Sequence, residues 1–103
     1  MIEIKYHRDV LLFLDELIEK GYFSFYEYSA QYIEDLVNYV KNNITTKPHK
    51  PAPAHFYKYG GNLFYITYNR NKQTTWYIFF QKTDSLYFIR YITNSHVAGR
   101  FFD

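Results

Sequence analysis

Three closely spaced runs of aromatic and β-branched residues decide the fold of this chain. They read Asn62-Leu-Phe-Tyr-Ile-Thr-Tyr-Asn-Arg70, Thr74-Thr-Trp-Tyr-Ile-Phe-Phe-Gln-Lys82 and Leu86-Tyr-Phe-Ile-Arg-Tyr-Ile-Thr93. Short polar breaks separate them, and runs of this composition favour strands. The stretch therefore predicts three strands of an antiparallel meander.

Alternation along these runs assigns the side chains to two faces of the sheet. One face is apolar, suits a cover of helices, and carries Phe64, Ile66, Trp76, Ile78 and Phe80. The other mixes rings with polar groups and carries Tyr65, Thr67, Tyr77, Phe79 and Gln81. In the last run either Arg90 or Tyr91 faces this second side, because a slip of one residue exchanges them.

The residues before the meander predict one strand and two helices. Residues 2–6 alternate between apolar and charged side chains, which favours a short half-buried strand. Asp9 is a candidate N-cap for a helix that ends at Gly21. Ser24 and Glu27 have the spacing of a capping box at the start of a second helix. Both helices carry apolar stripes that must pack on the sheet.

Residues 45–54 contain all three prolines of the chain and predict an extended basic connector to the sheet. The order of elements is then β-α-α-β-β-β. We expect an α+β fold of two layers, with an antiparallel sheet packed on a helical hairpin, in a single domain of residues 1–103.

Composition points to a globular protein with a recognition surface. Of the 103 residues, 48% are hydrophobic and 23% are aromatic, so more rings are present than a core of this size needs. There is no cysteine, which excludes disulfide and thiolate chemistry. No signal-peptide pattern and no run of about eighteen apolar residues occurs, so we expect a cytoplasmic protein without membrane contact.

Charge is distributed unevenly along the chain. Residues 1–44 hold four basic and eight acidic side chains, whereas residues 45–103 hold eight basic and two acidic ones. Such a split can indicate a polyanionic ligand on the basic side, although segregated surface charge gives the same pattern.

The motifs of several enzyme classes are missing from the sequence. There is no Cys/His metal pattern, no phosphate-binding glycine loop and no carboxylate pair in the sheet half. Cations, tyrosines and His96 at the end of the last strand suit RNA cleavage through the 2′-hydroxyl, with rings to hold bases. A histidine at that place can equally bond a local backbone carbonyl.

The order of elements, together with Tyr68-Asn-Arg70, Thr75-Trp-Tyr-Ile-Phe-Phe80 and Tyr91-Ile-Thr-Asn-Ser-His96, resembles the RelE/ParE superfamily of type II toxin–antitoxin modules. The resemblance implies a RelE-like toxin that binds messenger RNA on the ribosome and, as an endoribonuclease, cleaves it without a metal or other cofactor. It also implies an antitoxin on a separate chain.

Carried onto this sequence, the resemblance assigns a catalytic role to His96, Arg90 and Tyr91. The residues expected to bind RNA are Arg70, Lys72, Tyr65, Tyr77 and Arg100. RelE-like nucleases usually carry an arginine in the middle strand, where this chain has Trp76 or Tyr77. Two alternatives therefore stay open: a non-catalytic protein-binding module of the same fold, and a ParE-like gyrase inhibitor.

Overall fold

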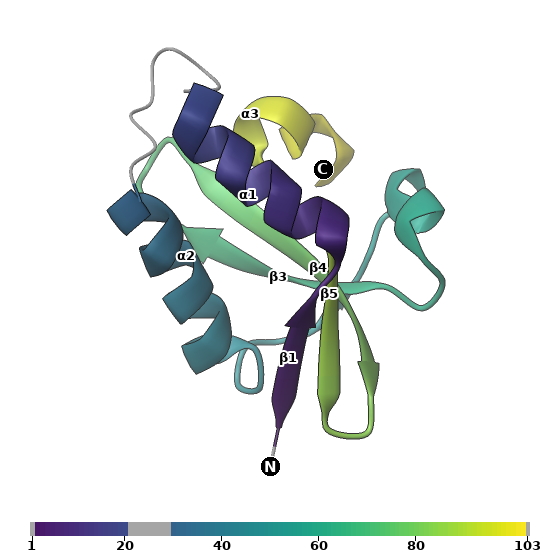
Figure 1. Ribbon diagram of the computed structural model, residues 1–103. Helices are drawn as coiled ribbons and strands as arrows, with labels where there is room; N and C mark the ends of the chain where they lie inside the picture. The colour runs from purple at the N-terminus through teal and green to yellow at the C-terminus, as the bar shows by residue number, and fades with distance from the viewer. Residues whose placement is uncertain (1, 21–29, 103) are drawn as a thin grey trace.

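The computed structural model describes residues 2–20 and 30–102, and in these residues five strands form one mixed sheet (Figure 1). The strands are β1 (Glu3–Tyr6), β2 (Lys50–Pro51), β3 (Phe64–Asn69), β4 (Thr75–Thr83) and β5 (Leu86–Asn94). Their spatial order is β1-β5-β4-β3-β2. The predicted meander is correct to within two residues at every strand end. The sheet is not wholly antiparallel as expected, because β1 runs parallel to β5.

Two amphipathic helices cover one face of this sheet, as the apolar stripes predicted. In α1 (Arg8–Lys20) the side chains of Val10, Leu14 and Leu17 are buried. In α2 (Ala30–Asn43) the buried set is Ile33, Leu36 and Val40. These spacings place each set on one side of its helix. No helix in the described part of the chain has the length and apolar character needed to span a membrane.

The first helix begins two residues earlier than the sequence suggested. Val10 N and Leu11 N both donate to the His7 carbonyl, and Asp9 N donates to His7 Nδ1 at 3.1 Å. The capping group is therefore the imidazole of His7, and the prediction that Asp9 caps the helix is wrong. The predicted helix end at Gly21 and the capping box of Ser24 and Glu27 lie outside the described residues.

The proline-rich connector contains a short strand that the sequence did not indicate. Lys50 and Pro51 form β2, which pairs with Tyr65 and Phe64 at the edge of the sheet. The chain then turns through a 3-10 helix, η1 (Ala54–Tyr59), before β3. After β5 it continues into α3 (Ser95–Ala98) and a second 3-10 turn, η2 (Gly99–Phe102).

The sheet therefore has a cover on both faces. The helix face carries Ile66, Trp76, Ile78, Phe80 and Ile89 against α1 and α2. The opposite side, which we call the aromatic face, carries Phe79 in a cluster with Ala52, Phe56, Leu63 and Ala98. The sequence predicted an open surface there. Instead, η1 and the C-terminal turn partly cover it, and its rings pack against one another.

Candidate functional site

A β-bulge in β5 places two functional side chains on the aromatic face. Phe79 pairs with Tyr91, but the next residue, Phe80, pairs with Ile89, so Arg90 is an extra residue in the ladder. A bulge interrupts the alternation of side chains and re-aims them. Arg90 and Tyr91 both lie on the aromatic face as a result. The sequence left open which of these two residues faces this side of the sheet. In the structure both do, because of the bulge.

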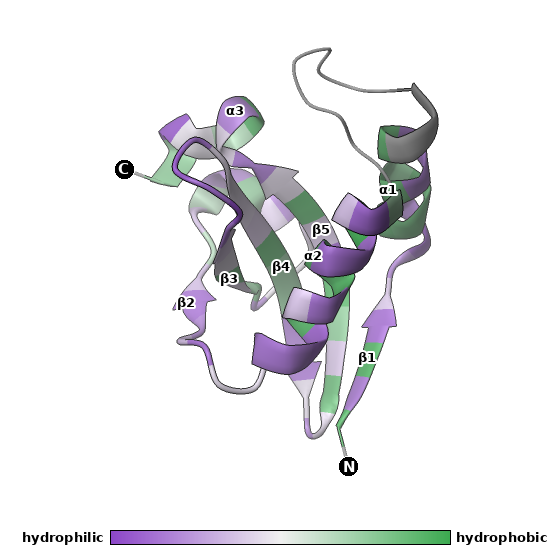
Figure 2. Cartoon of the chain, turned by 90° about the vertical axis from the view of Figure 1, so that its left-hand side faces the viewer, coloured by the Kyte–Doolittle hydropathy of each residue, from purple (hydrophilic) through white to green (hydrophobic). Residues whose placement is uncertain are grey.

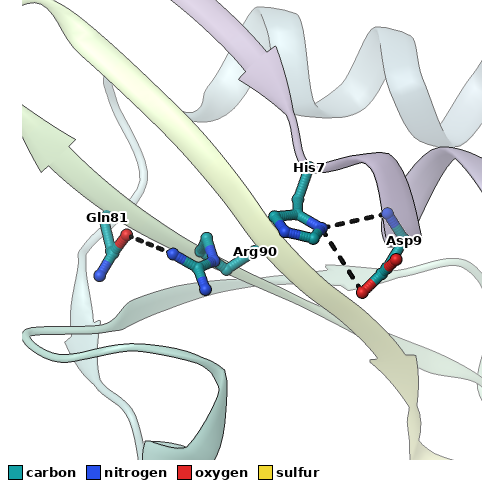
Figure 3. A network of polar contacts seen from close by, with 4 residues as sticks. All are labelled: His7, Asp9, Gln81 and Arg90. Atoms are coloured by element: carbon teal, nitrogen blue, oxygen red, sulfur yellow. Dashed lines mark hydrogen bonds and ion pairs between the residues drawn. The ribbon is translucent and has the colours of Figure 1, made fainter.

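The guanidinium of Arg90 is held in a defined position. Arg90 Nη1 donates to Gln81 Oε1 at 3.1 Å, and Gln81 Nε2 donates to the Gly61 carbonyl at 2.8 Å (Figure 3). The guanidinium also lies 5.4 Å from the Phe88 ring centroid. Gly60 has a φ of +146°, and a Cβ added there would meet Gln81 Nε2 at 2.7 Å. Glycine thus lets the end of η1 approach this pair.

His7 is brought beside Arg90 by the parallel pairing of β1 with β5. Its backbone N–H donates to the Ile89 carbonyl at 2.9 Å, and its ring lies 5.9 Å from that of Phe88. His7 Nδ1 accepts from Asp9 N and lies 3.7 Å from Asp9 Oδ2 (Figure 3). Because Nδ1 accepts a hydrogen bond, the ring proton of the neutral imidazole is on Nε2. His7 therefore has a second N–H donor that the helix cap does not use.

These groups line a cleft of about 280 Å³ between the start of α1, the bulge and the end of η1. Its lining residues are His7, Asp9, Val10, Phe13, Lys58, Tyr59, Arg90, Tyr91 and Ile92. We call it the bulge cleft. Arg90 and Lys58 are its full cations and Asp9 is its carboxylate. The other lining residues are a histidine, two tyrosines and three apolar side chains.

Two tyrosines stack at one side of the bulge cleft. The rings of Tyr59 and Tyr91 lie 3.9 Å apart and nearly parallel, at 8°. Burial, and then the hydrogen bond and charge of the Tyr91 hydroxyl, raise the pKa of Tyr59 to about 12. Tyr59 is therefore a neutral phenol at physiological pH. It can donate a hydrogen bond there, but it cannot act as a base.

Together these residues offer an anion several hydrogen-bond donors within one concave site. Arg90 has five N–H groups, of which Gln81 takes one, and the ammonium of Lys58 lies 5.4 Å from the Tyr59 ring centroid. Charge-assisted hydrogen bonds from such groups suit phosphate oxygens. Within the ranges 2–20 and 30–102, no three His, Cys, Asp or Glu residues gather as metal ligands would.

Among the residues that the sequence assigned to RNA, the two turn cations lie away from this cleft. Arg70 Nη2 is 3.8 Å from Asp35 Oδ2, and its guanidinium lies over the Tyr32 ring at 4.7 Å, so it faces α2. Lys72 is exposed in the β3–β4 turn. Asn71 Oδ1 orders that turn by accepting from Gln73 N and Thr74 N.

His96 lies beyond the end of β5, in the first turn of α3. Buried Asn94 caps this turn by accepting from His96 N and Val97 N, and His96 Nε2 is 2.9 Å from Thr74 Oγ1. Thr74 precedes β4, seven positions before Gln81, and at about 3.3 Å per residue this separation is roughly 20 Å. His96 and Arg90 are consequently not parts of one centre.

The remaining predicted residues lie on or near the aromatic face. Tyr77 stacks on Phe102 at 3.7 Å, and Tyr65 meets the same ring edge-on at 5.0 Å. Arg100 is exposed on η2, with its guanidinium 4.8 Å from the Phe101 ring centroid. Of the predicted catalytic set, the structure brings together Arg90 and Tyr91, and of the predicted RNA-binding set it brings together Tyr65 and Tyr77.

Four polar residues of the bulge cleft were not singled out from the sequence. These are His7, Asp9, Lys58 and Tyr59. Local patterns describe His7 only as the residue after a strand, and Lys58 only as one cation among aromatic residues. Their meeting depends on the parallel pairing of β1 with β5 and on the path of η1, which are long-range features. The sequence feature that could have pointed to them is their position next to the ends of predicted strands, helices or turns.

Comparison with known proteins found no relative of this chain. No family model, no curated protein and no solved structure matches it. The resemblance to RelE/ParE toxins therefore rests on the order of elements and on the residues quoted for it. Function has to be argued from the chemistry of the site.

Proposed function

We propose that this chain is a RelE-like toxin of a type II toxin–antitoxin system that binds single-stranded RNA at the bulge cleft. The observation that carries the proposal is the convergence of two cations with further hydrogen-bonding side chains in this one concave site. Arg90 and Lys58 supply the positive charge, and His7 and Tyr59 supply the further hydrogen-bonding groups.

The architecture supports this proposal without deciding it. An antiparallel meander with two helices on one face is the arrangement that the RelE/ParE resemblance implies. The same arrangement can carry unrelated functions, including inhibition of gyrase or binding of a protein partner. The chemistry of the bulge cleft is what favours RNA over these alternatives.

The donors of the cleft match the backbone of RNA better than its bases. Arginine presents a planar fork of N–H groups that fits two phosphate oxygens, and lysine adds a compact positive charge. Nε2 of His7 and the Tyr59 hydroxyl can bond a phosphate oxygen or a 2′-hydroxyl. Asp9 is the single carboxylate among the lining residues, and it can accept from a 2′-hydroxyl.

Base stacking is assigned to a different ring from those expected. The rings of Tyr65 and Tyr77 are occupied by Phe102. Tyr57, next to Lys58 on η1, is 65% exposed. Tyr57 lines a separate hollow with Gly60 and Phe64 rather than the bulge cleft. We therefore assign it to the base of an adjoining nucleotide, where stacking is worth about 1–3 kcal/mol.

Binding to a labelled single-stranded RNA, measured by fluorescence anisotropy over a range of salt concentrations, tests the proposal. We expect Arg90→Gln and Lys58→Gln each to weaken binding by about tenfold, since a charge-assisted hydrogen bond is worth roughly 1.5–3 kcal/mol. Each should also reduce the salt slope by about 0.7, the value for one phosphate on a single strand.

Lys72→Gln is the matched control, because it removes an equally exposed cation outside the cleft. Equal losses in all three variants would show unspecific attraction and contradict the site. A wild type that binds no RNA but inhibits gyrase would support the ParE-like alternative. In the same samples, the length of the RNA on a gel shows whether it is cleaved. Comparing the cleavage rates of His7→Ala and His96→Ala identifies which histidine takes part in cleavage.

A further inference from the structure

The sheet has β2 at one edge and β1 at the other (Figure 2). Along one edge β2 is only two residues long, and prolines 48, 51 and 53 lie in or beside it. Proline at an edge obstructs the addition of another strand, because it has no N–H to donate. Along the other edge β1 runs for four residues without proline. The edge at β1 thus lacks the protection that the edge at β2 has.

Among the residues that the structure describes, no strand pairs with the outer side of β1. Glu3 N donates to the Ser85 carbonyl and His7 N to the Ile89 carbonyl, both at 2.9 Å, so the odd-numbered residues face β5. Successive residues of a strand direct their N–H and C=O groups to opposite sides. The backbone groups of Ile2, Ile4 and Tyr6 therefore point away from β5, toward the free edge.

The side chains of the same three residues line an apolar groove of about 450 Å³ between β1 and α2. Val37 completes its floor, and Lys41 and Asn42 lie at its rim. Ile2 is 45% exposed, although it is a large aliphatic side chain. A strand added at this edge would place its own alternate side chains against the groove. Apolar residues at those positions are what it would need.

We propose that the strand that pairs here is β1 of a second copy of this chain. If two copies run antiparallel with Ile4 opposite Ile4, then Ile2 lies opposite Tyr6, and Glu3 lies opposite Lys5. The sequence Ile-Glu-Ile-Lys-Tyr at residues 2–6 is thus complementary to itself in both hydrophobicity and charge. Opposite charges and apolar pairs directly across strands are favourable, and like charges there are unfavourable.

Hydrogen bonding is compatible with this alignment, because it requires even-numbered residues to lie opposite one another, and charge complementarity then selects among the registers that meet this condition. An antiparallel pair alternates between hydrogen-bonded and non-hydrogen-bonded residue pairs. In the proposed register the hydrogen-bonded pairs involve Ile2, Ile4 and Tyr6, whose backbone groups are the ones that point outward. Glu3 and Lys5 then form the non-hydrogen-bonded pairs, in which side chains lie closest, at Cα separations of about 4.5 Å.

The result is a two-fold symmetric dimer with one continuous sheet across both copies. The same surface is used on each copy, which is the usual form of a closed homodimer. The pairing covers the edge of β1 and brings the apolar grooves of the two copies beside the seam. It is independent of RNA binding, since it uses none of the residues assigned to phosphate contacts.

Sedimentation equilibrium of the full chain, from micromolar to millimolar concentrations, tests the dimer. We expect wild type to dimerise, and Lys5→Glu or Glu3→Lys to raise the dissociation constant by roughly thirtyfold, because each turns two attractive pairs into two repulsive ones. Mixing the two single variants should restore association, since one chain then carries acidic side chains at both positions and the other carries basic ones. The double variant should also dimerise.

Lys50→Glu is the matched control, because it makes the same charge change on the opposite edge strand, and it should leave the dimer intact. Circular dichroism of each variant shows that these exposed substitutions leave the fold unchanged. A wild type that stays monomeric at all concentrations overturns the proposal, even if another protein binds at this edge. So does a dimer that ignores both single substitutions, or a mixture of the two that fails to associate.

Discussion

The two faces of the sheet differ in how completely their side chains are buried. We assign stability mainly to the helix face and function to the aromatic face. On the helix face, side chains such as Leu17, Leu36 and Trp76 have no exposed surface. On the aromatic face, fewer residues are fully buried, and rings such as Tyr59 and Tyr91 are only partly buried. A closed apolar layer contributes stability, whereas a layer of stacked, partly wet rings leaves polar groups able to meet a ligand.

The bulge explains why the candidate site lies on the second face. Strict alternation would have given the aromatic face only one of Arg90 and Tyr91. The extra residue gives it both, next to the end of η1 and the start of α1. On the helix face the cation Arg70 lies at the margin, where it meets Asp35 of α2.

Among variants that compare the two faces, we expect Trp76→Ala to cause the largest loss in the free energy of unfolding. Trp76 is fully buried in the helix-face core, and its Nε1 donates to the Tyr32 hydroxyl at 3.0 Å. Deleting a buried tryptophan side chain leaves a cavity and costs about 3–5 kcal/mol. We expect urea unfolding to show a loss of this size, which is a large part of the stability of a small domain.

Phe102→Ala is the counterpart on the aromatic face. The Phe102 ring is half buried and stacks on Tyr77 at 3.7 Å. A partly exposed ring loses less transfer free energy, so a loss of about 1–2 kcal/mol is expected in the same urea experiment. Equal losses for the two variants would mean that the faces do not divide stability in the way described.

A smaller effect should follow from Gly60→Ala, which alters the site rather than the core. The added Cβ would meet Gln81 Nε2 at 2.7 Å, and the φ of +146° is unfavourable for alanine. We expect a loss of about 1–3 kcal/mol from backbone strain, together with weaker RNA binding because the Gln81–Arg90 pair is displaced. Urea unfolding and anisotropy measure the two effects.

Gly61→Ala is its neighbouring control. A Cβ there has no neighbouring atom within 4 Å, and its φ is outside the left-handed range. Stability and RNA affinity should change little. If Gly60→Ala leaves affinity unchanged while it lowers stability, the position of Arg90 does not depend on this approach of η1.

Most of the fold could be predicted from the sequence because its signals are local. The strand runs of the meander, the strand at residues 3–6 and the apolar stripes of both helices follow from residue types at fixed spacing. The helix start was misplaced, because Asp9 is a common capping residue, whereas the capping group is the ring of His7. Strand β2 was missed because prolines argue against strands, and an edge is where they are tolerated.

Less of the candidate site could be predicted, because it depends on long-range pairing. No glycine in the sequence marks the position of the bulge at Arg90, and the bulge is recognised only from the pairing of β5 with β4. His96 was favoured because it follows a strand, and it does, but it lies beyond the end of β5, whereas Arg90 lies in the middle of that strand. His7 reaches the site because β1 pairs in parallel with β5, and local sequence patterns do not predict this pairing.

The smallest effect that distinguishes the faces is a change in the pKa of one tyrosine on each face, Tyr6 and Tyr59. Burial raises the pKa of Tyr6, on the helix face, to about 12, and burial followed by Tyr91 raises the pKa of Tyr59 to about 12. The ordinary pKa is 10.0, so the unfolded chain loses these protons first as pH rises. Their contribution to stability is fully present below pH 10 and is lost as pH rises from about 10 to about 12.

Urea unfolding over this pH range should therefore show a fall in stability that is reduced by Tyr6→Phe and by Tyr59→Phe. Tyr91→Phe distinguishes the two faces. It removes the neighbouring hydroxyl from Tyr59, so the pKa of Tyr59 should decrease only partly, because burial is the larger cause. The pKa of Tyr6, whose raised value has burial as its cause, should not move. Nuclear magnetic resonance of ring-labelled tyrosine resolves both residues among the thirteen tyrosines of the chain. A shift in the pKa of Tyr6 in this variant would show that the two faces are coupled through β5.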